Sequence, residues 1–123
     1  MIDHVGLNVT DYETSKRFFE QALEPLGYRV VMDFPEFGGA GFGTGSSPDF
    51  WIMARDPRGT GTHVAFEVSE RGTVDAFHAA ALAAGGADNG APGVRVHYHP
   101  TYYAAFVLDP DGNNIEAVCH QPG

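Results

Sequence analysis

The sequence repeats itself at an offset of 59 residues, and this internal repeat limits the possible folds more than any other feature. The segment His4–Thr10 matches His63–Ser69 position by position, and the similarity continues as far as Gly27 and Gly86. Eight of the twenty-four positions between residues 4 and 27 are identical in the two halves. A repeated unit of this size is typically one supersecondary module that packs against its copy. We therefore predict a single domain, residues 1–123, made of two equivalent modules, 1–58 and 59–123.

Each module begins with the alternation that is typical of a half-buried strand. The apolar positions of this alternation are Val5, Leu7 and Val9 in the first module, and Val64, Phe66 and Val68 in the second. The pattern then changes to helical spacing. Thr10 and Glu13 form a predicted capping box, Ser69 is the corresponding helix start, and glycines follow both apolar stripes.

Short strands separated by turn signals follow each predicted helix. They are expected at 28–34, 39–42 and 50–54 in the first module, and at 94–97, 103–108 and 114–119 in the second. One helix can cover only one face of such a sheet. The predicted fold is therefore α+β: two tandem βαβββ modules that form one curved mixed sheet, with the helices on its outer face and a cleft on its inner face.

The composition limits the binding partners and the cellular location that we expect for the protein. Seven basic and sixteen acidic residues give a net charge of −9, which disfavours nucleic acid and anionic membranes. The chain has no run of eighteen apolar residues and no apolar leader at its start, so we expect neither a membrane span nor secretion. The single cysteine, Cys119, is expected to be a buried apolar residue rather than half of a disulfide. These features favour a cytoplasmic protein.

Three residues are candidate metal ligands. His4 and His63 occupy the same position in the two repeats, opposite the apolar side of their strands. Glu116 lies on the corresponding side of the last predicted strand. Two imidazoles and a carboxylate that face one cleft can bind a divalent metal and leave coordination positions open. The alternative is that both histidines are ordinary surface residues and that the glutamate is merely solvated.

The sequence resembles the vicinal oxygen chelate superfamily, which includes glyoxalase I, bleomycin-resistance proteins and extradiol dioxygenases. The resemblance rests on Asp3–Val5, Thr62–Phe66 and the run Asp109–Glu116, which contains the Asp-Pro-Asp-Gly turn. It implies paired βαβββ modules, a homodimer, and a divalent ion (Fe, Mn, Zn, Ni or Co) that chelates a small-molecule substrate. In many members each site is shared between two chains, so His4 and His63 of one site can belong to different subunits.

Departures from the family pattern leave the reaction class open. Glyoxalase I-like enzymes usually carry a fourth ligand, Glu or Gln, where this chain has Trp51. A His-His-Glu site resembles that of extradiol dioxygenases and fosfomycin-modifying transferases, yet the tyrosine that those dioxygenases carry on the penultimate strand is Phe106 here. We therefore predict that the protein is a metal-dependent lyase, isomerase or dioxygenase. The alternative is a small-molecule binding protein similar to the bleomycin-resistance proteins, which lack the metal ligands.

The second module also contains a segment without a counterpart in the first, His97–Tyr103. We predict catalytic roles for His97, His99 and Tyr102 as acid, base or hydrogen-bond donor. The two histidines would share a face if the strand continued through them. Tyr103 is predicted to contact substrate, and so are Trp51 and Met53, which alternate into the cleft. The alternative is that Pro100 starts a turn, that the tyrosines pack at a dimer interface, and that Trp51 and Met53 fill a closed core.

Overall fold

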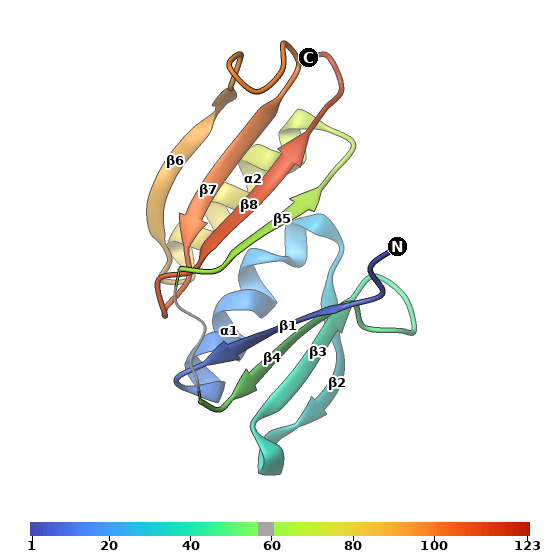
Figure 1. Cartoon of the computed structure of the whole chain (residues 1–123), viewed down its shortest axis with the longest axis vertical. Helices are drawn as coiled ribbons and strands as arrows, with labels where there is room; N and C mark the ends of the chain where they lie inside the picture. The colour runs from blue at the N-terminus through green and yellow to red at the C-terminus, as the bar shows by residue number, and fades with distance from the viewer. Residues whose placement is uncertain (57–60) are drawn as a thin grey trace.

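The computed structural model describes residues 1–56 and 61–123, and it contains the predicted βαβββ unit twice (Figure 1). The first module consists of β1 (Val5–Val9), α1 (Tyr12–Ala22), η1 (Glu24–Leu26), β2 (Arg29–Phe34), η2 (Pro35–Phe37), β3 (Gly39–Gly43) and β4 (Phe50–Ala54). The second consists of β5 (His63–Glu67), α2 (Arg71–Ala83), β6 (Ala87–Val94), β7 (Tyr103–Leu108) and β8 (Asn114–Cys119). The predicted fold class is confirmed. The predicted module boundary, between residues 58 and 59, lies outside the described residues.

The two modules have the same sheet topology. The strand orders are β1-β4-β3-β2 and β5-β8-β7-β6, with the first pair parallel in each sheet and the others antiparallel. Gly6 pairs with Trp51 in one sheet, and Ala65, the repeat equivalent of Gly6, pairs with Glu116 in the other. Trp51 therefore occupies the position of Glu116, as the sequence alignment predicted. Among the described strands the ladders stay within a module, so the mixed sheet consists of two four-stranded sheets.

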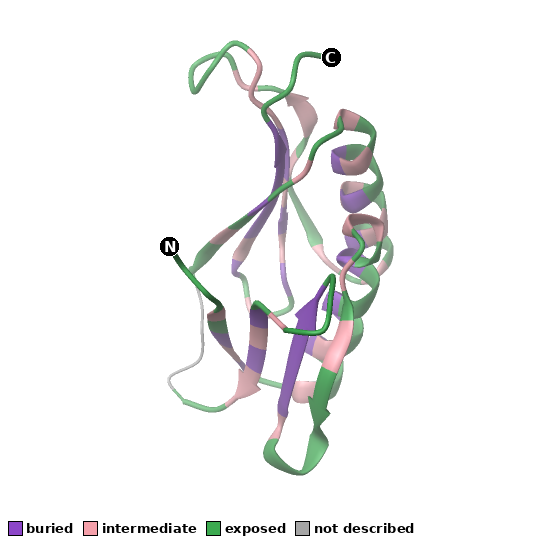
Figure 2. Ribbon diagram, turned by 90° about the vertical axis from the view of Figure 1, so that its right-hand side faces the viewer, coloured by how far each residue is buried: buried purple, intermediate pink, exposed green. Residues whose placement is uncertain are grey.

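Both helices lie on one side of the sheets and leave the opposite faces open (Figure 2). Repeat-equivalent residues on the helices pack in the same way, because Phe18 and Phe77 are both fully buried. A series of edge-to-face aromatic contacts links Phe19 to Phe50 and Phe50 to Phe66, with ring centroids 4.9 and 5.4 Å apart. The hydrophobic core is therefore continuous between the modules. Cys119 is buried in it, as expected.

Both predicted helix N-caps were wrong. The N-cap of α1 is Asp11, whose side chain accepts a hydrogen bond from the Thr14 amide, whereas Thr10 bonds to the second module instead. The N-cap of α2 is Glu70 rather than Ser69.

The strand expected at 94–97 is instead β6, which ends at Val94. This strand contains Gly90, Pro92 and Gly93, which usually signal a turn, but it lies at the sheet edge and carries register shifts, where such residues are tolerated.

No helix in the described part of the chain combines the length and the apolar character that a membrane crossing requires.

Candidate functional site

The open face of the second module carries a cavity of about 530 Å³. Alternation along the strands directs Phe106 and Glu116 away from the helices, and the same holds for His63 at the start of β5. The residues that line the cavity are His63, His97, Tyr98, Tyr102, Phe106, Asn114 and Glu116. Two of the three predicted metal ligands and two of the three predicted catalytic residues thus lie in one cavity.

His63 and Glu116 form the polar centre of this cavity. His63 Nε2 lies 3.0 Å from Glu116 Oε1, and the glutamate side chain is only 2% exposed. His63 Nδ1 lies 3.1 Å from the backbone oxygen of Asn114. A carbonyl oxygen only accepts hydrogen bonds, so Nδ1 carries the hydrogen and the lone pair of the neutral ring is on Nε2.

This donor set fits a divalent metal ion. In neutral His63, the lone pair of Nε2 faces a lone pair of Glu116 Oε1 across 3.0 Å, which requires a cation or an additional proton between them. A backbone carbonyl that orients the far nitrogen of the ring is the usual partner of a metal-binding histidine. A nearly fully buried carboxylate likewise needs a compensating positive charge. An imidazole and a carboxylate are ligands that Zn, Fe, Mn, Co and Ni accept.

Tyr102 is the third polar group of the centre. Its hydroxyl donates a hydrogen bond of 2.5 Å to Glu116 Oε2, the oxygen that does not face His63. Burial and this hydrogen bond to the carboxylate raise the pKa of Tyr102 to about 12. The phenol is therefore neutral near pH 7 and acts as a hydrogen-bond donor rather than as a base.

The two other predicted catalytic residues differ in their surroundings. His97 lines the cavity, and its ring contacts Tyr98 with centroids 4.2 Å apart. His99 does not line it, because its Nδ1 accepts a hydrogen bond from the Thr101 amide within the turn. The strand that would have put both histidines on one face ends at Val94, so that expectation is corrected.

Tyr103 points to the opposite side of the sheet from Tyr102. Its hydroxyl donates to Asp75 of α2 at 2.6 Å, and the Arg71 guanidinium lies 4.9 Å from its ring centre. The hydrogen bond to Asp75 raises the pKa of Tyr103. Tyr103 is therefore part of the contact between helix and sheet, and this chain does not present it to the cavity as predicted.

His4 and Trp51 lie together in a different cavity, of about 440 Å³, on the open side of the first module. The His4 ring contacts a carboxylate, with Nδ1 2.8 Å from Asp3 Oδ2, and this contact leaves Nε2 available. Trp51 stacks on Phe34, with the planes 3° apart and the centroids separated by 6.4 Å. Met53, the third predicted substrate contact, pairs with Asn8 and Gly39 and is not in the lining of this cavity.

The predicted ligand triad does not converge within one chain. Within residues 1–56 and 61–123, no group of three His, Cys, Asp or Glu side chains is placed to bind a metal. His4 lines the first module's cavity and also the cavity at the junction of the modules, whereas His63 and Glu116 share the second module's cavity. The expectation of one common cleft is thus corrected for the single chain, because each sheet presents an open face of its own.

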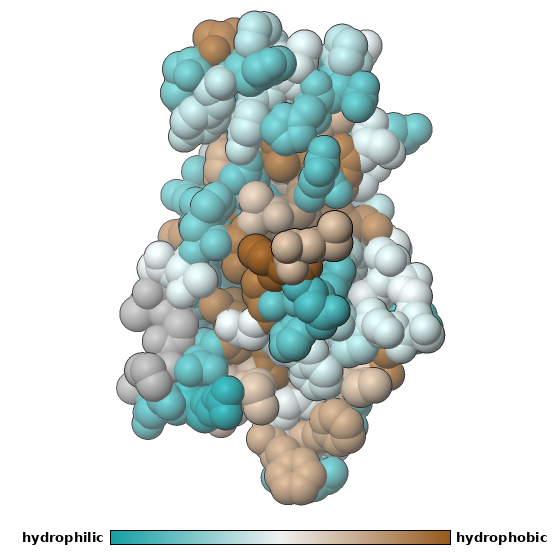
Figure 3. All heavy atoms as spheres, turned by 45° about the vertical axis from the view of Figure 1, so that its right-hand side comes forward, coloured by the Kyte–Doolittle hydropathy of each residue, from teal (hydrophilic) through white to brown (hydrophobic). Residues whose placement is uncertain are grey.

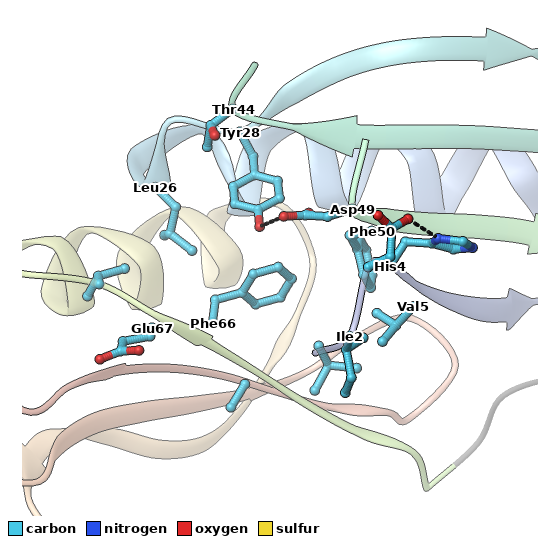
Figure 4. A pocket seen from close by; sticks show the side chains of 14 residues that line it. Ile2, His4, Val5, Leu26, Tyr28, Thr44, Asp49, Phe50, Phe66 and Glu67 are labelled. Atoms are coloured by element: carbon cyan, nitrogen blue, oxygen red, sulfur yellow. Dashed lines mark hydrogen bonds and ion pairs between the residues drawn. The ribbon is translucent and has the colours of Figure 1, made fainter. Parts of the chain in front are cut away.

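A further cavity, of about 470 Å³, lies at the junction of the modules. Tyr28 donates a hydrogen bond of 3.1 Å to Asp49 there, and its ring meets Phe66 edge to face (Figure 4). Burial, followed by this bond to Asp49, strongly raises the pKa of Tyr28. Apolar atoms are visible at the middle of the molecule, between more hydrophilic regions of the two modules (Figure 3).

Sequence reasoning did not single out Asn114 or Asp3 as parts of a site, and it gave Tyr98 no role of its own within the segment His97–Tyr103. Asn114 acts through its backbone oxygen, which no side-chain pattern reveals. Asn114 could have been found only by predicting that β5 pairs in parallel with β8, because this pairing places residue 114 beside His63. Asp3 directly precedes His4, and an acidic neighbour of a candidate ligand was a usable signal. Tyr98 lines the cavity from the turn after β6.

With its paired βαβββ modules, open sheet faces and a cavity that contains a histidine and a glutamate, the chain is a two-module α+β protein. The model of the glyoxalase/bleomycin resistance protein/dioxygenase superfamily matches residues 1–117, and the chain belongs to this superfamily. The resemblance noted in the sequence is thereby confirmed.

Solved structures show the same fold. A glyoxalase/bleomycin resistance protein from Albidiferax ferrireducens T118 is 32% identical, with 98% of both chains covered and a TM-score of 0.79. A glyoxalase/bleomycin resistance protein/dioxygenase family enzyme from Burkholderia phytofirmans PsJN is 22% identical, with 98% of both covered and a TM-score of 0.73. The fosfomycin resistance protein FosX from Mesorhizobium loti is 18% identical over 97% of this chain and 91% of its own, with a TM-score of 0.69. No curated protein matches the chain.

Proposed function

We propose that the protein is a divalent-metal-dependent enzyme that acts on a small molecule through two adjacent oxygen atoms. The observation that carries the proposal is the His63–Glu116 pair, whose facing atoms are 3.0 Å apart beneath an open cavity. Membership of a superfamily that includes glyoxalases and dioxygenases supports it. A lyase, an isomerase or a dioxygenase working at such a metal site would each begin by chelating the substrate, and the proposal covers all three.

We further propose that the third ligand is His4 of a second copy of the chain. His4 is the repeat equivalent of His63, and a carboxylate holds its Nδ1 as a carbonyl holds that of His63. Its own module cannot provide the other ligands, because Trp51 stands where Glu116 stands in the second module. A twofold homodimer would complete two identical sites, each built from both chains.

Different residues of the protein would have different roles at such a site. A bound divalent ion would act as a Lewis acid on the substrate oxygens. Phe106, Tyr98 and His97 would form the aromatic wall on the second module. Trp51 shares a cavity with His4 of its own chain, so at the shared site it would come with His4 from the second copy and form an apolar wall that excludes water and adds no ligand. Three protein ligands would leave room for a chelating substrate.

Metal analysis tests the proposal directly. Wild-type protein purified without chelator and supplied with Zn²⁺, Mn²⁺, Fe²⁺, Co²⁺ or Ni²⁺ is expected to retain about one ion per chain. His4→Ala, His63→Ala and Glu116→Ala are each expected to lower that content severalfold, because each removes a ligand. His78→Ala is the control, since His78 contacts Asp88 and lies outside these cavities. Equal metal content in all variants would contradict the proposal and favour the alternative of a binding protein without metal catalysis.

A further inference from the structure

The two oxygens of Glu116 are held by different groups. Oε1 lies 3.0 Å from His63 Nε2, whereas Oε2 accepts the hydroxyl hydrogen of Tyr102 at 2.5 Å. The side chain of Glu116 is 2% exposed, so water does not compete for either oxygen. The carboxylate therefore has one oxygen directed to the imidazole and one engaged by the phenol.

Tyr102 is itself held in place by its neighbours. Its ring packs edge to face against Tyr98 and His120, with centroids 5.0 and 5.3 Å away. Its backbone oxygen accepts a hydrogen bond of 2.7 Å from the Arg95 amide, and its amide donates one of 3.1 Å to the His99 oxygen. The phenol is thus positioned by the turn between β6 and β7 independently of any ligand.

We propose that Tyr102 is a positioning residue that restricts Glu116 to a single coordinating oxygen. This inference rests on the proposed function, because it concerns the ligand role of Glu116. With Oε2 held by the Tyr102 hydroxyl, the oxygen that Glu116 presents beside His63 is Oε1. Three ligands that each contribute one atom leave three positions of an octahedral ion open. A carboxylate that bound through both oxygens would leave two, and a substrate with two adjacent oxygens would fill both.

The adjacent tyrosine provides a matched control. Tyr103 also donates its hydroxyl to a carboxylate, that of Asp75, at 2.6 Å. It lies on the helix-facing side of the sheet, away from Glu116. Tyr102→Phe and Tyr103→Phe therefore remove the same group from adjacent residues, and only the first touches a proposed ligand.

The test measures Co²⁺ binding rather than activity. Competition titration gives the affinity, and the visible absorption bands of bound Co²⁺ report its coordination. Tyr102→Phe is expected to weaken Co²⁺ binding about tenfold, as is usual when a group that supports a ligand is lost, and to change the absorption bands. Tyr103→Phe is expected to leave both unchanged. Thermal melting of the metal-free proteins checks folding, and if Tyr102→Phe does not fold, Tyr102→Met, which also lacks the hydroxyl and adapts to the space that the ring fills, replaces it.

The outcomes separate this inference from the proposed function. If wild-type protein binds no Co²⁺, the proposed function fails and the inference fails with it. If wild-type protein binds Co²⁺ and Tyr102→Phe matches it in affinity and spectrum, the inference alone is overturned. A weaker affinity with an unchanged spectrum also overturns it, because Tyr102 would then affect affinity without controlling which oxygens coordinate.

Discussion

Trp51 owes its position to the absence of a side chain at Gly41. The two residues are cross-strand partners, and a Cβ atom built at Gly41 would lie 3.0 Å from the indole ring and 2.8 Å from Pro48 Cβ. Only glycine lets the indole lie over this strand and stack on Phe34. The shape of the proposed apolar wall therefore depends on one residue that never contacts a ligand.

Gly41→Ala is expected to lower the free energy of unfolding by about 1–3 kcal/mol, because the added methyl group overpacks the strand. It should also change the fluorescence of Trp51, the only tryptophan of the chain. Urea unfolding followed by this fluorescence measures both effects. Gly6→Ala is the control, since a Cβ at Gly6, which pairs with Trp51 from the other side, meets nothing within 4 Å. Equal stability of the two variants would show that Gly41 is not required.

His78 and Asp88 predict a pH dependence of stability. The hydrogen bond from His78, at 2.9 Å, and a second from the Gly90 amide hold the pKa of Asp88 below its usual value of 3.8. A carboxylate whose pKa is lower in the folded state stabilises the protein above its unfolded pKa. This contribution is lost as the pH falls through the folded-state value.

Asp88→Asn is therefore expected to be less stable than wild type at neutral pH, with a difference that shrinks below about pH 4. Urea midpoints measured from pH 7 to pH 3 test this. Glu20→Gln, which removes a charge from an exposed position of α1, should show no such convergence. A constant difference between Asp88→Asn and wild type over the whole range would rule out the linkage.

At the scale of elements, the turn between β7 and β8 connects the modules. Asp109 and Asn113 are buried within it and bond to each other, while Asn113 also accepts a hydrogen bond from the Thr62 amide just before β5. Burial raises the pKa of Asp109, although the hydrogen bonds from Asn113 act to lower it. Asp111 accepts hydrogen bonds from the amide and the hydroxyl of Thr10, at the end of β1. The Asp-Pro-Asp-Gly turn thus has a structural role here.

Asp111→Ala is expected to reduce the free energy of unfolding by about 1–2 kcal/mol, because it removes two hydrogen bonds to a charged acceptor. Thr10→Ala should cost less, since its amide remains. Thermal or urea unfolding of both variants and of the double variant forms a double-mutant cycle. The two effects are expected to be less than additive, and full additivity would show that the residues do not interact across the modules.

For the whole molecule, the shared-site proposal predicts complementation between two defective proteins. His4→Ala keeps His63 and Glu116, whereas Glu116→Ala keeps His4. A mixed dimer of the two would have one complete site and one that lacks both groups. Neither variant alone should bind metal well, but a mixture that has been unfolded and refolded together should bind about a quarter of the wild-type amount, because about half of the dimers are mixed.

Metal analysis after refolding measures this recovery, and light scattering gives the mass of the particle. Mixing His4→Ala with a His4→Ala, Glu116→Ala double variant is the control, because no combination of these chains completes a site. A protein that is monomeric with metal bound, or a mixture that recovers nothing although mixed dimers form, would contradict a site shared between chains.

The repeat explains why so much of the fold could be predicted. Alternation and helical spacing are local properties of the sequence, and they recur in both halves, so each module supports the interpretation of the other. The same alignment predicted that Trp51 occupies the position of Glu116, and the strand register bears this out. Errors occurred where contacts distant in sequence override local preference, as when Thr10 bonds to Asp111 instead of capping α1.

The sequence by itself determined the two modules, the sides of the strands and the chemical types of the candidate ligands, because period and register depend on neighbouring residues. Only the tertiary structure decided which of these side chains meet. It joined Tyr102 to Glu116, directed Tyr103 to Asp75, and placed His4 in a different cavity from His63. The physical reason is that each sheet has its own open face, and the relative placement of two such faces depends on packing between residues that are far apart in the chain.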